Sequence, residues 1–423
     1  QLPPEISFEH VYGNDIDAMS VYIARINYAL KYGIHDAATI YTHITSKDYL
    51  LFGKDRQFDF ILGNPPWGYV FSDSQKTRLR ERYTVATGNN LESYDLFVEQ
   101  ALSNLKEGGL LSFVLPEAIL NVKTHTPVRK VMLNCCSFQY IEFLGNAFDK
   151  VQCPCIILQA VFTNSVFNSK GLKICDGSRE YMISTNRRMN AACISFSTTD
   201  EEYRILEKMD HLKNKTTLSG NARFALGIVT GNNKKYISQE KTSENEMILK
   251  GSDLCKFRFH PSTNYIVFKP ESFQQTAPTE YYRAPEKLLY RFICNQLVFS
   301  YDNTRTLSLN SCNILIPDIP DLSIKYIMAV LNSRIAQFYF KKQFHSVKIL
   351  RTHIEQIPVP VIEKTVQKEI VAIVDSILET ADHLLIKDMY DDLDMRIASL
   401  YEMSSEEYHI IKSSMENENL FLD

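Results

Sequence analysis

The chain has 423 residues, of which 45% are apolar and 23% are charged, and its formal net charge is −4. One hydrophobic core rarely covers this length, so two domains with an appendage are expected. The ordinary composition excludes a small disulfide-stapled scaffold. No apolar run reaches the roughly eighteen residues of a membrane span, which predicts a soluble protein without a membrane partner.

Nine cysteines are scattered along the chain, and no pair has the C-x2-C spacing of a zinc site. We therefore predict no metal. An odd number of cysteines without a signal peptide indicates a reducing, cytoplasmic location. The chain begins at Gln1, inside what the pattern indicates is the middle of a fold, so we expect upstream sequence to be missing.

Up to about residue 175, short β-rich runs alternate with longer amphipathic stretches, which predicts an α/β domain with a parallel sheet over residues 1–190. Apolar residues at helical spacing predict helices at residues 17–32 and 91–105, the second closed by Lys106-Glu107-Gly108-Gly109. Strands are expected at residues 58–62, 110–115, 140–144 and 156–162.

From about residue 215 the helical periodicity weakens, and short strands such as residues 265–268 and 313–316 predict a mixed α+β domain over residues 200–360. One helix is expected at residues 325–340. Residues 361–423 predict a helical C-terminal tail, which we interpret as a solvated cap.

Charge is distributed unevenly along the chain. Residues 212–360 hold 20 Lys and Arg against 11 Asp and Glu, and residues 361–423 hold 5 against 15. A basic block of this kind is what attraction to phosphates requires, although ordinary variation of surface charge gives the same pattern.

The most informative segment is Asn64-Pro65-Pro66-Trp67, which directly follows the predicted strand at residues 58–62. Proline fixes φ and lacks an amide hydrogen, so the loop is rigid and its carbonyls are free to accept hydrogen bonds. At the carboxyl end of a parallel strand, the loop lies where open α/β sheets bind ligands. Asn64 and the Pro65 carbonyl can accept both hydrogens of an exocyclic amine, while Trp67 stacks on a base. A proline turn with an incidental tryptophan is the structural alternative.

This order of strand, glycine, Asn-Pro-Pro and aromatic residue resembles the amino-methyltransferases that use S-adenosylmethionine. It is most similar to the gamma-class, TaqI-like adenine-N6 DNA methyltransferases of restriction-modification systems. The resemblance implies a Rossmann-like methyltransferase domain in which Asn64, Pro65, Pro66 and Trp67 are catalytic. It also implies that Trp67 and Phe148 hold the two faces of an adenine flipped out of duplex DNA, although a core phenylalanine is the alternative at position 148.

The same resemblance implies a cofactor site. Asp15 and Ile16 match the acidic segment that binds the cofactor ribose, Asp48 and Tyr49 match the pair that contacts its adenine, and Asn64 completes the set. One departure is that the family's glycine-rich loop should precede Asp15, yet no G-x-G occurs in the chain. We therefore expect a domain that is incomplete at its N-terminus, with weak or absent cofactor binding by this chain alone.

Residues 223–237, 249–253 and 330–360 resemble segments of TaqI-like target-recognition domains, which implies double-stranded DNA as the partner. Lysine, arginine and asparagine suit contacts with phosphates and base edges. A basic cluster lies within the third of these segments and consists of Lys341, Lys342, His345, Lys348 and Arg351. The DNA contacts expected from the resemblance are Thr230, Asn232, Lys234, Lys235, Arg334, Lys341, Lys342, Lys348 and Arg351.

Other functions remain open at this point. The loop would serve an amino-methyltransferase acting on RNA, on protein glutamine or on cytosine N4 equally well. A second alternative is the methyltransferase part of a bifunctional restriction endonuclease and methyltransferase. Because no [Asp/Glu]-x-Lys occurs in the chain, any nuclease would lie upstream or on a partner protein. A catalytically silent DNA-binding subunit is the third alternative.

Overall fold

The computed structural model describes residues 6–51, 56–148, 153–163, 165–177, 179–187, 198–344 and 348–415, with residues 189, 191, 194 and 196. It divides the chain into two compact units, Gln1–Thr199 and Asp200–Asp423. Among the described residues, no helix is long and apolar enough to cross a membrane.

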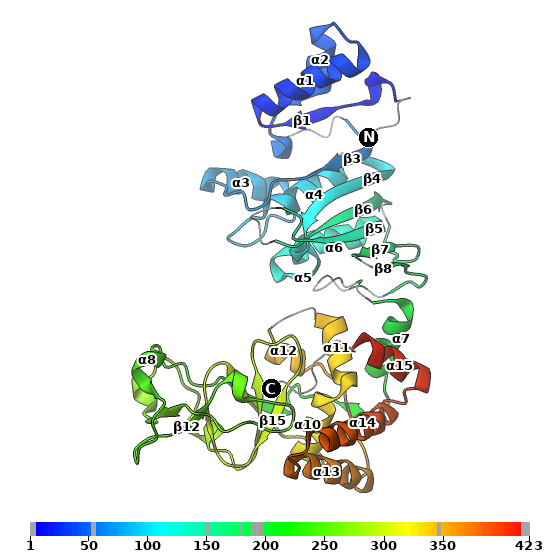
Figure 1. Ribbon diagram of the computed structural model, residues 1–423. Helices are drawn as coiled ribbons and strands as arrows, with labels where there is room; N and C mark the ends of the chain where they lie inside the picture. Colours follow the sequence, from blue (N-terminus) through cyan, green and yellow to red (C-terminus); the bar gives the residue numbers. More distant parts are fainter. Residues whose placement is uncertain are drawn as a thin grey trace. The chain divides into compact units, whose positions relative to one another are not determined.

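A six-stranded mixed sheet forms the centre of the first unit, with the strand order β3-β4-β6-β5-β7-β8 (Figure 1). β3 and β4 pair in parallel, whereas β6 runs antiparallel to both β4 and β5. The expectation of a wholly parallel sheet is therefore wrong at β6, which follows β5 directly without a crossover helix. The strands are β3 (Phe58–Gly63), β4 (Leu105–Pro116), β5 (Cys136–Gly145), β6 (Cys155–Phe162), β7 (Lys173–Asp176) and β8 (Arg179–Met182).

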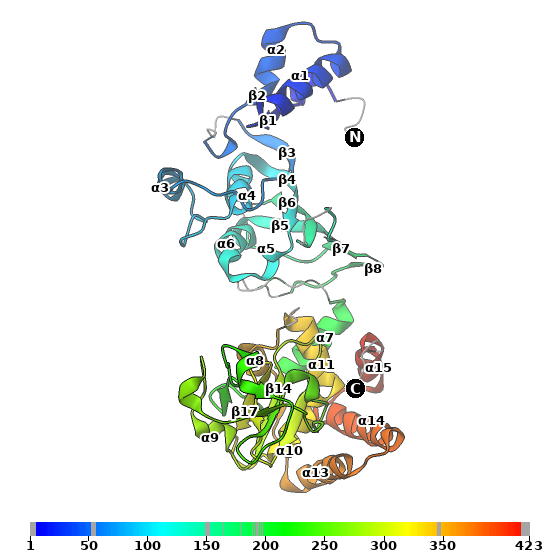
Figure 2. The ribbon, with the colours of Figure 1, turned by 60° about the vertical axis from the view of Figure 1, so that its left-hand side comes forward.

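Helices lie along one face of this sheet in Figure 2. They are α4 (Ser93–Ser103), α5 (Ala118–Asn121) and α6 (Thr126–Cys135). Leu111, Phe113 and Leu115 alternate along β4 and are buried in the same core as Leu96 and Val98 of α4. Their packing holds α4 against the face of the sheet.

The N-terminal part of this unit contains two parallel strands, β1 (Gly13–Asp15) and β2 (Ile44–Ser46), with α1 (Ala18–Tyr32) and α2 (Ala37–His43). The predicted helix at residues 17–32 is confirmed by α1. Asp17 caps its first turn by accepting a hydrogen bond from the Ser20 amide at 2.7 Å. Only two side chains of α1 are buried. Five large apolar side chains of α1 are exposed: Met19, Tyr22, Ile23, Ile26 and Leu30.

The glycines at positions 108 and 109 do not cap a helix as expected. α4 ends at Ser103, and both glycines lie within β4. At Gly109 a Cβ atom would lie 2.9 Å from the Lys106 carbonyl oxygen of β4 itself and 3.0 Å from the Phe58 carbonyl oxygen of β3, so the close approach of both backbones favours glycine there.

The second unit is built around a four-stranded sheet with the order β10-β17-β14-β15. Successive residues of β14 face opposite sides: Leu288 and Tyr290 pack into a core shared with helices, and Leu289 packs toward a smaller sheet, β11-β13-β12-β16. The strands are β10 (Ala222–Ala225), β11 (Ile237–Ser238), β12 (Glu246–Leu249), β13 (Tyr265–Ile266), β14 (Lys287–Arg291), β15 (Phe299–Asp302), β16 (Leu307–Ser308) and β17 (Cys312–Pro317), with β9 (Lys215–Thr216) paired to β18 (Val359–Pro360).

The predicted single helix at residues 325–340 is two helices, α10 (Ile324–Asn332) and α11 (Arg334–Phe344). Ser333 is extended, with ψ at 157°, and its hydroxyl accepts a hydrogen bond from the Ala336 amide at 3.1 Å. The Asn332 side chain accepts from and donates to the backbone of Phe299 in β15. A cap and a link to the sheet therefore break the helix where periodicity alone predicts continuity.

The C-terminal tail shares the hydrophobic core of the second unit, so its interpretation as a solvated cap is wrong. Ile370, Val374, Tyr390 and Ile397 are buried in the same cluster as Leu288. The remaining helices of the unit are α7 (Asp200–Asp210), α8 (Asn233–Tyr236), α9 (Thr279–Tyr282), α12 (Arg351–Ile354), α13 (Lys364–Glu379), α14 (His383–Leu400) and α15 (Ser405–Ser414).

A fully buried ion pair in the second unit gives a stability prediction. Lys287 Nζ lies 2.6 Å from Asp302 Oδ2, and both side chains are 0% exposed. Asp302→Asn should lower the free energy of unfolding by about 3–5 kcal/mol, because it leaves a buried ammonium group without its counter-ion. Urea denaturation measures this change.

The matched control is Asp59→Asn, which breaks an exposed pair with Lys106 at 2.9 Å and should cost at most about 1 kcal/mol. Equally small effects of both substitutions would show that the buried pair does not stabilise the unit.

Candidate active site

The Asn-Pro-Pro-Trp loop begins directly after β3, at the carboxyl end of the strand. Asn64 is exposed, Pro65 is buried and Trp67 is half-buried. The Pro66 carbonyl accepts a hydrogen bond from the Ser93 hydroxyl at the start of α4. In the part of the chain that the structure describes, the Asn64 amide oxygen and the Pro65 carbonyl accept no hydrogen bond. The loop is therefore held at Pro66 and presents two acceptors in front of it.

Phe148 reaches the same place from a different strand. β5 runs parallel to β3 and β4, since both β4 and β5 are antiparallel to β6, so its carboxyl end at Gly145 lies on the same edge as the loop. The Phe148 and Trp67 ring centroids are 5.3 Å apart and the rings are nearly perpendicular, at 81°. Phe148 is 40% exposed. Because the rings touch each other, a flat ligand that stacks on both must first separate them.

The indole of Trp67 carries an unusual polar feature. Its N–H is buried and finds no hydrogen-bond acceptor among the described residues. A buried donor of this kind costs about 1–3 kcal/mol, and such groups call for a specific explanation in a folded protein. The loop thus retains an unsatisfied donor next to its free acceptors.

The predicted cofactor residues come together at the ends of β1 and β2. Parallel pairing places Asp15 opposite Ser46, two residues before Asp48. The Asp15 carboxylate accepts from the Asp17 amide at 2.9 Å, and the Asp48 carboxylate accepts from the Leu50 amide at 3.0 Å. Both acids thus shape local turns at one sheet edge.

The two apolar members of the predicted cofactor set, Ile16 and Tyr49, differ in exposure. Ile16, next to Asp15, is 71% exposed, whereas Tyr49 is half-buried. Tyr49 opens the short 3-10 helix η2 (Tyr49–Leu51), and its ring packs 5.4 Å from that of Phe97 in α4. These residues offer carboxylates and flat apolar surface, which suit a ribose and an adenine ring.

In the second unit, the turn around Gly231 presents two exposed lysines. Asn232 caps α8 by accepting from the Lys235 amide at 3.2 Å, and the buried Thr230 hydroxyl donates to Asn233 at 2.5 Å. Lys234 and Lys235 are exposed. Thr230 and Asn232 thus shape the turn, and the lysines carry its charge.

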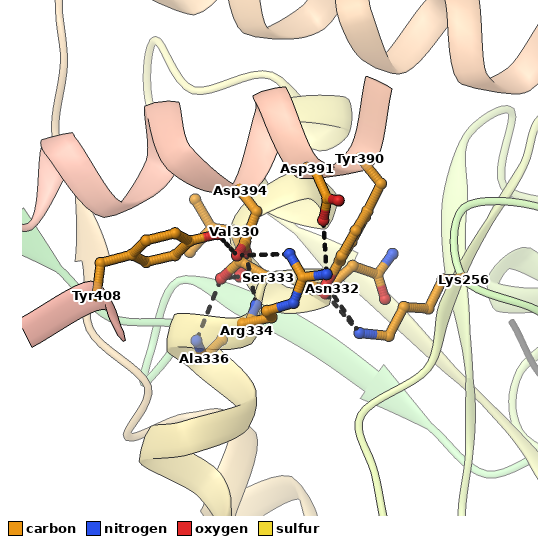
Figure 3. Close-up of polar contacts among 10 residues, drawn as sticks. All are labelled: Lys256, Val330, Asn332, Ser333, Arg334, Ala336, Tyr390, Asp391, Asp394 and Tyr408. Atoms are coloured by element: carbon orange, nitrogen blue, oxygen red, sulfur yellow. Dashed lines mark hydrogen bonds and ion pairs between the residues drawn. The ribbon is translucent and has the colours of Figure 1, made fainter. Parts of the chain in front are cut away.

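Arg334 is placed differently from the sequence-based expectation of a DNA contact. Figure 3 shows its guanidinium between two aspartates of α14, with Nη2 2.6 Å from Asp391 and Nη1 3.1 Å from Asp394. The side chain is only 7% exposed, and the guanidinium lies 4.9 Å from the Tyr390 ring centroid. This position serves the joint between α11 and α14, so we leave Arg334 out of the set proposed to contact DNA.

The other predicted basic residues are partly engaged. Lys342 pairs with Glu202 at 2.7 Å and its side chain is 11% exposed. Lys341 is half-buried and Lys348 is exposed. Arg351 is exposed and pairs with Glu355 at 2.8 Å. His345 lies outside the described residues.

Ion pairs within the unit also join the basic block to acidic residues elsewhere in it. Lys325 pairs with Asp375 at 2.5 Å and Arg334 pairs with Asp391. Part of the charge contrast between the basic block and the acidic tail is therefore neutralised inside the unit.

Sequence reasoning missed two features near the loop. The Ser93 contact joins residues 27 apart in sequence and has no local signal. The second feature is α3 (Asp73–Arg82), which projects away from the sheet in Figures 1 and 2. The sequence did contain a signal for a basic surface here, since residues 76–82 include four Lys and Arg.

Comparison with known proteins gives one match in each unit. Residues 9–148 match the family described as Eco57I restriction-modification methylase, and residues 246–359 match the family described as TaqI-like C-terminal specificity domain. In these two segments the chain is similar to restriction-modification methylases and to their specificity domains. The candidate loop and Phe148 lie inside the methylase match.

Two relatives show how much of such a protein the chain covers. The type II methyltransferase M.VspI of Vibrio sp. (strain 343) is 28% identical over 263 residues, 58% of this chain and 59% of that protein. The type II restriction enzyme and methyltransferase RM.Eco57I of Escherichia coli is 27% identical over 208 residues, 45% of this chain and 20% of that protein. The chain thus spans less than two thirds of either relative.

Among solved structures, the type IIL restriction-modification enzyme MmeI in complex with DNA is similar in fold, with a TM-score of 0.60 and 11% identity. The similarity covers 97% of this chain and 66% of that one. The expected fold class is thereby confirmed: the first unit has a Rossmann-like α/β fold, and the second is a mixed α+β unit with C-terminal helices.

Proposed function

We propose that the chain carries the catalytic and target-recognition parts of an S-adenosylmethionine-dependent DNA methyltransferase that modifies adenine N6 in a restriction-modification system. The observation that carries the proposal is the pair of free acceptors, on Asn64 and Pro65, beside the Trp67–Phe148 ring contact. An exocyclic amine has two hydrogens to donate, and an adenine has two faces to stack. The site offers partners for both.

The reaction begins when the target adenine leaves the base stack, at a cost of about a few kcal/mol. Trp67 and Phe148 separate and hold its two faces. Asn64 and the Pro65 carbonyl accept the hydrogens of the amine, which localises the nitrogen lone pair and makes the nitrogen nucleophilic. Because proline fixes φ at positions 65 and 66, the acceptors are oriented before the base arrives.

The residues at the ends of β1 and β2 fit S-adenosylmethionine. The segment of Asp15 and Ile16 suits the ribose, whose hydroxyls the Asp15 carboxylate can bind, and Asp48 and Tyr49 suit an adenine ring. When bound, this cofactor supplies an electrophilic methyl group. The chain's own contribution is to align the amine nitrogen with that methyl group.

The second unit supports DNA as the substrate. Its match to a specificity domain and the exposed Lys234 and Lys235 favour a partner with a phosphate backbone over protein glutamine. The methyltransferase relatives come from restriction-modification systems. Seven described cysteines form no disulfide bond, which suits the cytoplasm, where we place the protein; they are Cys135, Cys136, Cys153, Cys155, Cys175, Cys294 and Cys312.

A second candidate function is the methyltransferase part of an enzyme that also cleaves DNA. Two relatives are named as both restriction enzyme and methyltransferase, and the chain covers 25% and 20% of them. A cleavage assay on unmethylated DNA distinguishes the two candidates, since only the second predicts nuclease activity in the complete enzyme.

The catalytic role of the loop gives a direct prediction. Asn64→Ala should lower the rate of methyl transfer more than about 100-fold, because it removes one acceptor for the amine, while DNA affinity stays within about twofold. Transfer of a labelled methyl group at about 1 mM S-adenosylmethionine and a gel-shift titration measure the two quantities. Asn90→Ala, at an exposed asparagine before α4, is the control; equal transfer by both variants contradicts the role of Asn64.

DNA binding by the Gly231 turn predicts a change in salt dependence. Replacing Lys234 and Lys235 together with Gln should reduce the slope of log affinity against log salt by about 2, since each phosphate contact contributes about 0.9. Fluorescence anisotropy at several salt concentrations measures the slope. Replacing the exposed Lys387 and Lys412 with Gln is the charge-matched control, and identical slopes for the two double variants would rule out contact by the turn.

Cofactor affinity of the chain alone should be low. The 423 residues contain no G-x-G turn, which would let the backbone approach the ligand closely. Calorimetric titration of the purified chain with S-adenosylmethionine should give a dissociation constant near the millimolar range, about −4 kcal/mol. Micromolar binding would contradict the expectation and show that the residues at β1 and β2 suffice.

A further inference from the structure

The first turn of α4 is linked to the candidate loop instead of being capped by its own residues. Glu92, at the N-cap position, makes no side-chain capping bond. The next side chain, Ser93, is 1% exposed, and its hydroxyl donates to the Pro66 carbonyl. A serine at the start of a helix commonly binds an amide of that helix. Here it binds the diproline loop.

The next two residues of α4 are fixed from the opposite side. The Tyr94 hydroxyl lies 2.8 Å from His125 Nε2, and His125 Nδ1 lies 3.0 Å from both carboxylate oxygens of Asp95. All three side chains are buried. Burial raises the pKa of the Tyr94 hydroxyl and that of Asp95, the latter opposed by the bond from His125.

The donors and acceptors form one consistent chain. Tyr94 keeps its proton and donates to Nε2, so Nδ1 carries the imidazole proton and donates to Asp95. His125 ends the 3-10 helix η3 (Lys123–His125) and directly precedes α6. The network therefore joins the first turn of α4 to the start of α6 through buried side chains.

Consecutive placement couples these contacts. Ser93, Tyr94 and Asp95 lie on a single helical turn, so fixing Tyr94 and Asp95 also fixes the position of the Ser93 hydroxyl. In the loop, the two prolines leave ψ as the main remaining backbone freedom. The bond to Ser93 sets the direction of the Pro66 carbonyl and so restricts ψ at Pro66, between Asn64 and Trp67.

We propose that Ser93 is a positioning residue of the candidate site, and that the Tyr94–His125–Asp95 network holds it in place. Ser93 touches neither the target base nor the cofactor; it orients the loop that does. The effect of Ser93 on the rate of methyl transfer rests on the proposed function. Its effect on the position of Trp67 does not.

The sequence offers a specific probe, because Trp67 is the only tryptophan and its fluorescence reports on the loop alone. Ser93→Ala should increase quenching of Trp67 by acrylamide about 1.5-fold or more. It should also lower the rate of methyl transfer about tenfold, since a small displacement of reacting groups has large kinetic effects. DNA affinity should stay within about twofold.

Two further variants keep the test decisive. Ser103→Ala, on the same helix, removes a hydroxyl that, among the described residues, bonds to the Gln100 carbonyl within α4, and both readouts should stay at the wild-type value. Ser93→Cys keeps the shape of the side chain, with a somewhat larger atom that donates only weakly in place of the hydroxyl oxygen, so it should reproduce the effects of Ser93→Ala without a cavity.

Wild-type quenching in both Ser93 variants would overturn the proposal, as would a lower transfer rate with unchanged quenching. If the wild-type protein transfers no methyl group to DNA, the proposed function fails, and the quenching comparison still decides whether Ser93 positions the loop.

Discussion

Two consecutive prolines at the carboxyl end of β3 are the constraint on which the candidate site depends. The first of them, Pro65, is buried, and the two rings fix φ on both sides of its carbonyl. That carbonyl and the Asn64 amide oxygen have no hydrogen-bond donor among the described residues. A flexible loop would fold back to satisfy these acceptors. Stiffness therefore keeps hydrogen-bonding capacity available for an incoming amine. The loop follows β3, an edge strand of the sheet that pairs in parallel with β4.

The sheet topology supplies the second requirement, an aromatic partner for Trp67. Because β3, β4 and β5 all run in one direction, segments that follow them meet at one edge, and Phe148 contacts Trp67 although 81 residues separate the two in sequence. In the second unit, some of the basic side chains that the sequence suggests for DNA binding form ion pairs within the unit instead. Arg334 and Lys342 pair internally, whereas Lys234 and Lys235 stay exposed.

Local signals in the sequence predicted the loop, α1 and the fold class, since proline pairs, capping aspartates and apolar spacing act over a few residues. Contacts between distant residues decided the rest. The break at Ser333 depends on a bond from Asn332 to a strand 33 residues earlier, and the burial of Arg334 depends on Asp394, 60 residues later. Likewise, antiparallel β6 depends on pairing with two strands, which apolar patterning does not specify.

The central claim is that this chain directs methylation of adenine N6 in DNA. Its most direct test is sequencing for modified bases in the source genome, with the gene intact and with the gene deleted. We expect N6-methyladenine at one defined sequence, and we expect it to be lost throughout the genome on deletion. An unchanged pattern of modified adenines, or loss of N4-methylcytosine instead, would contradict it.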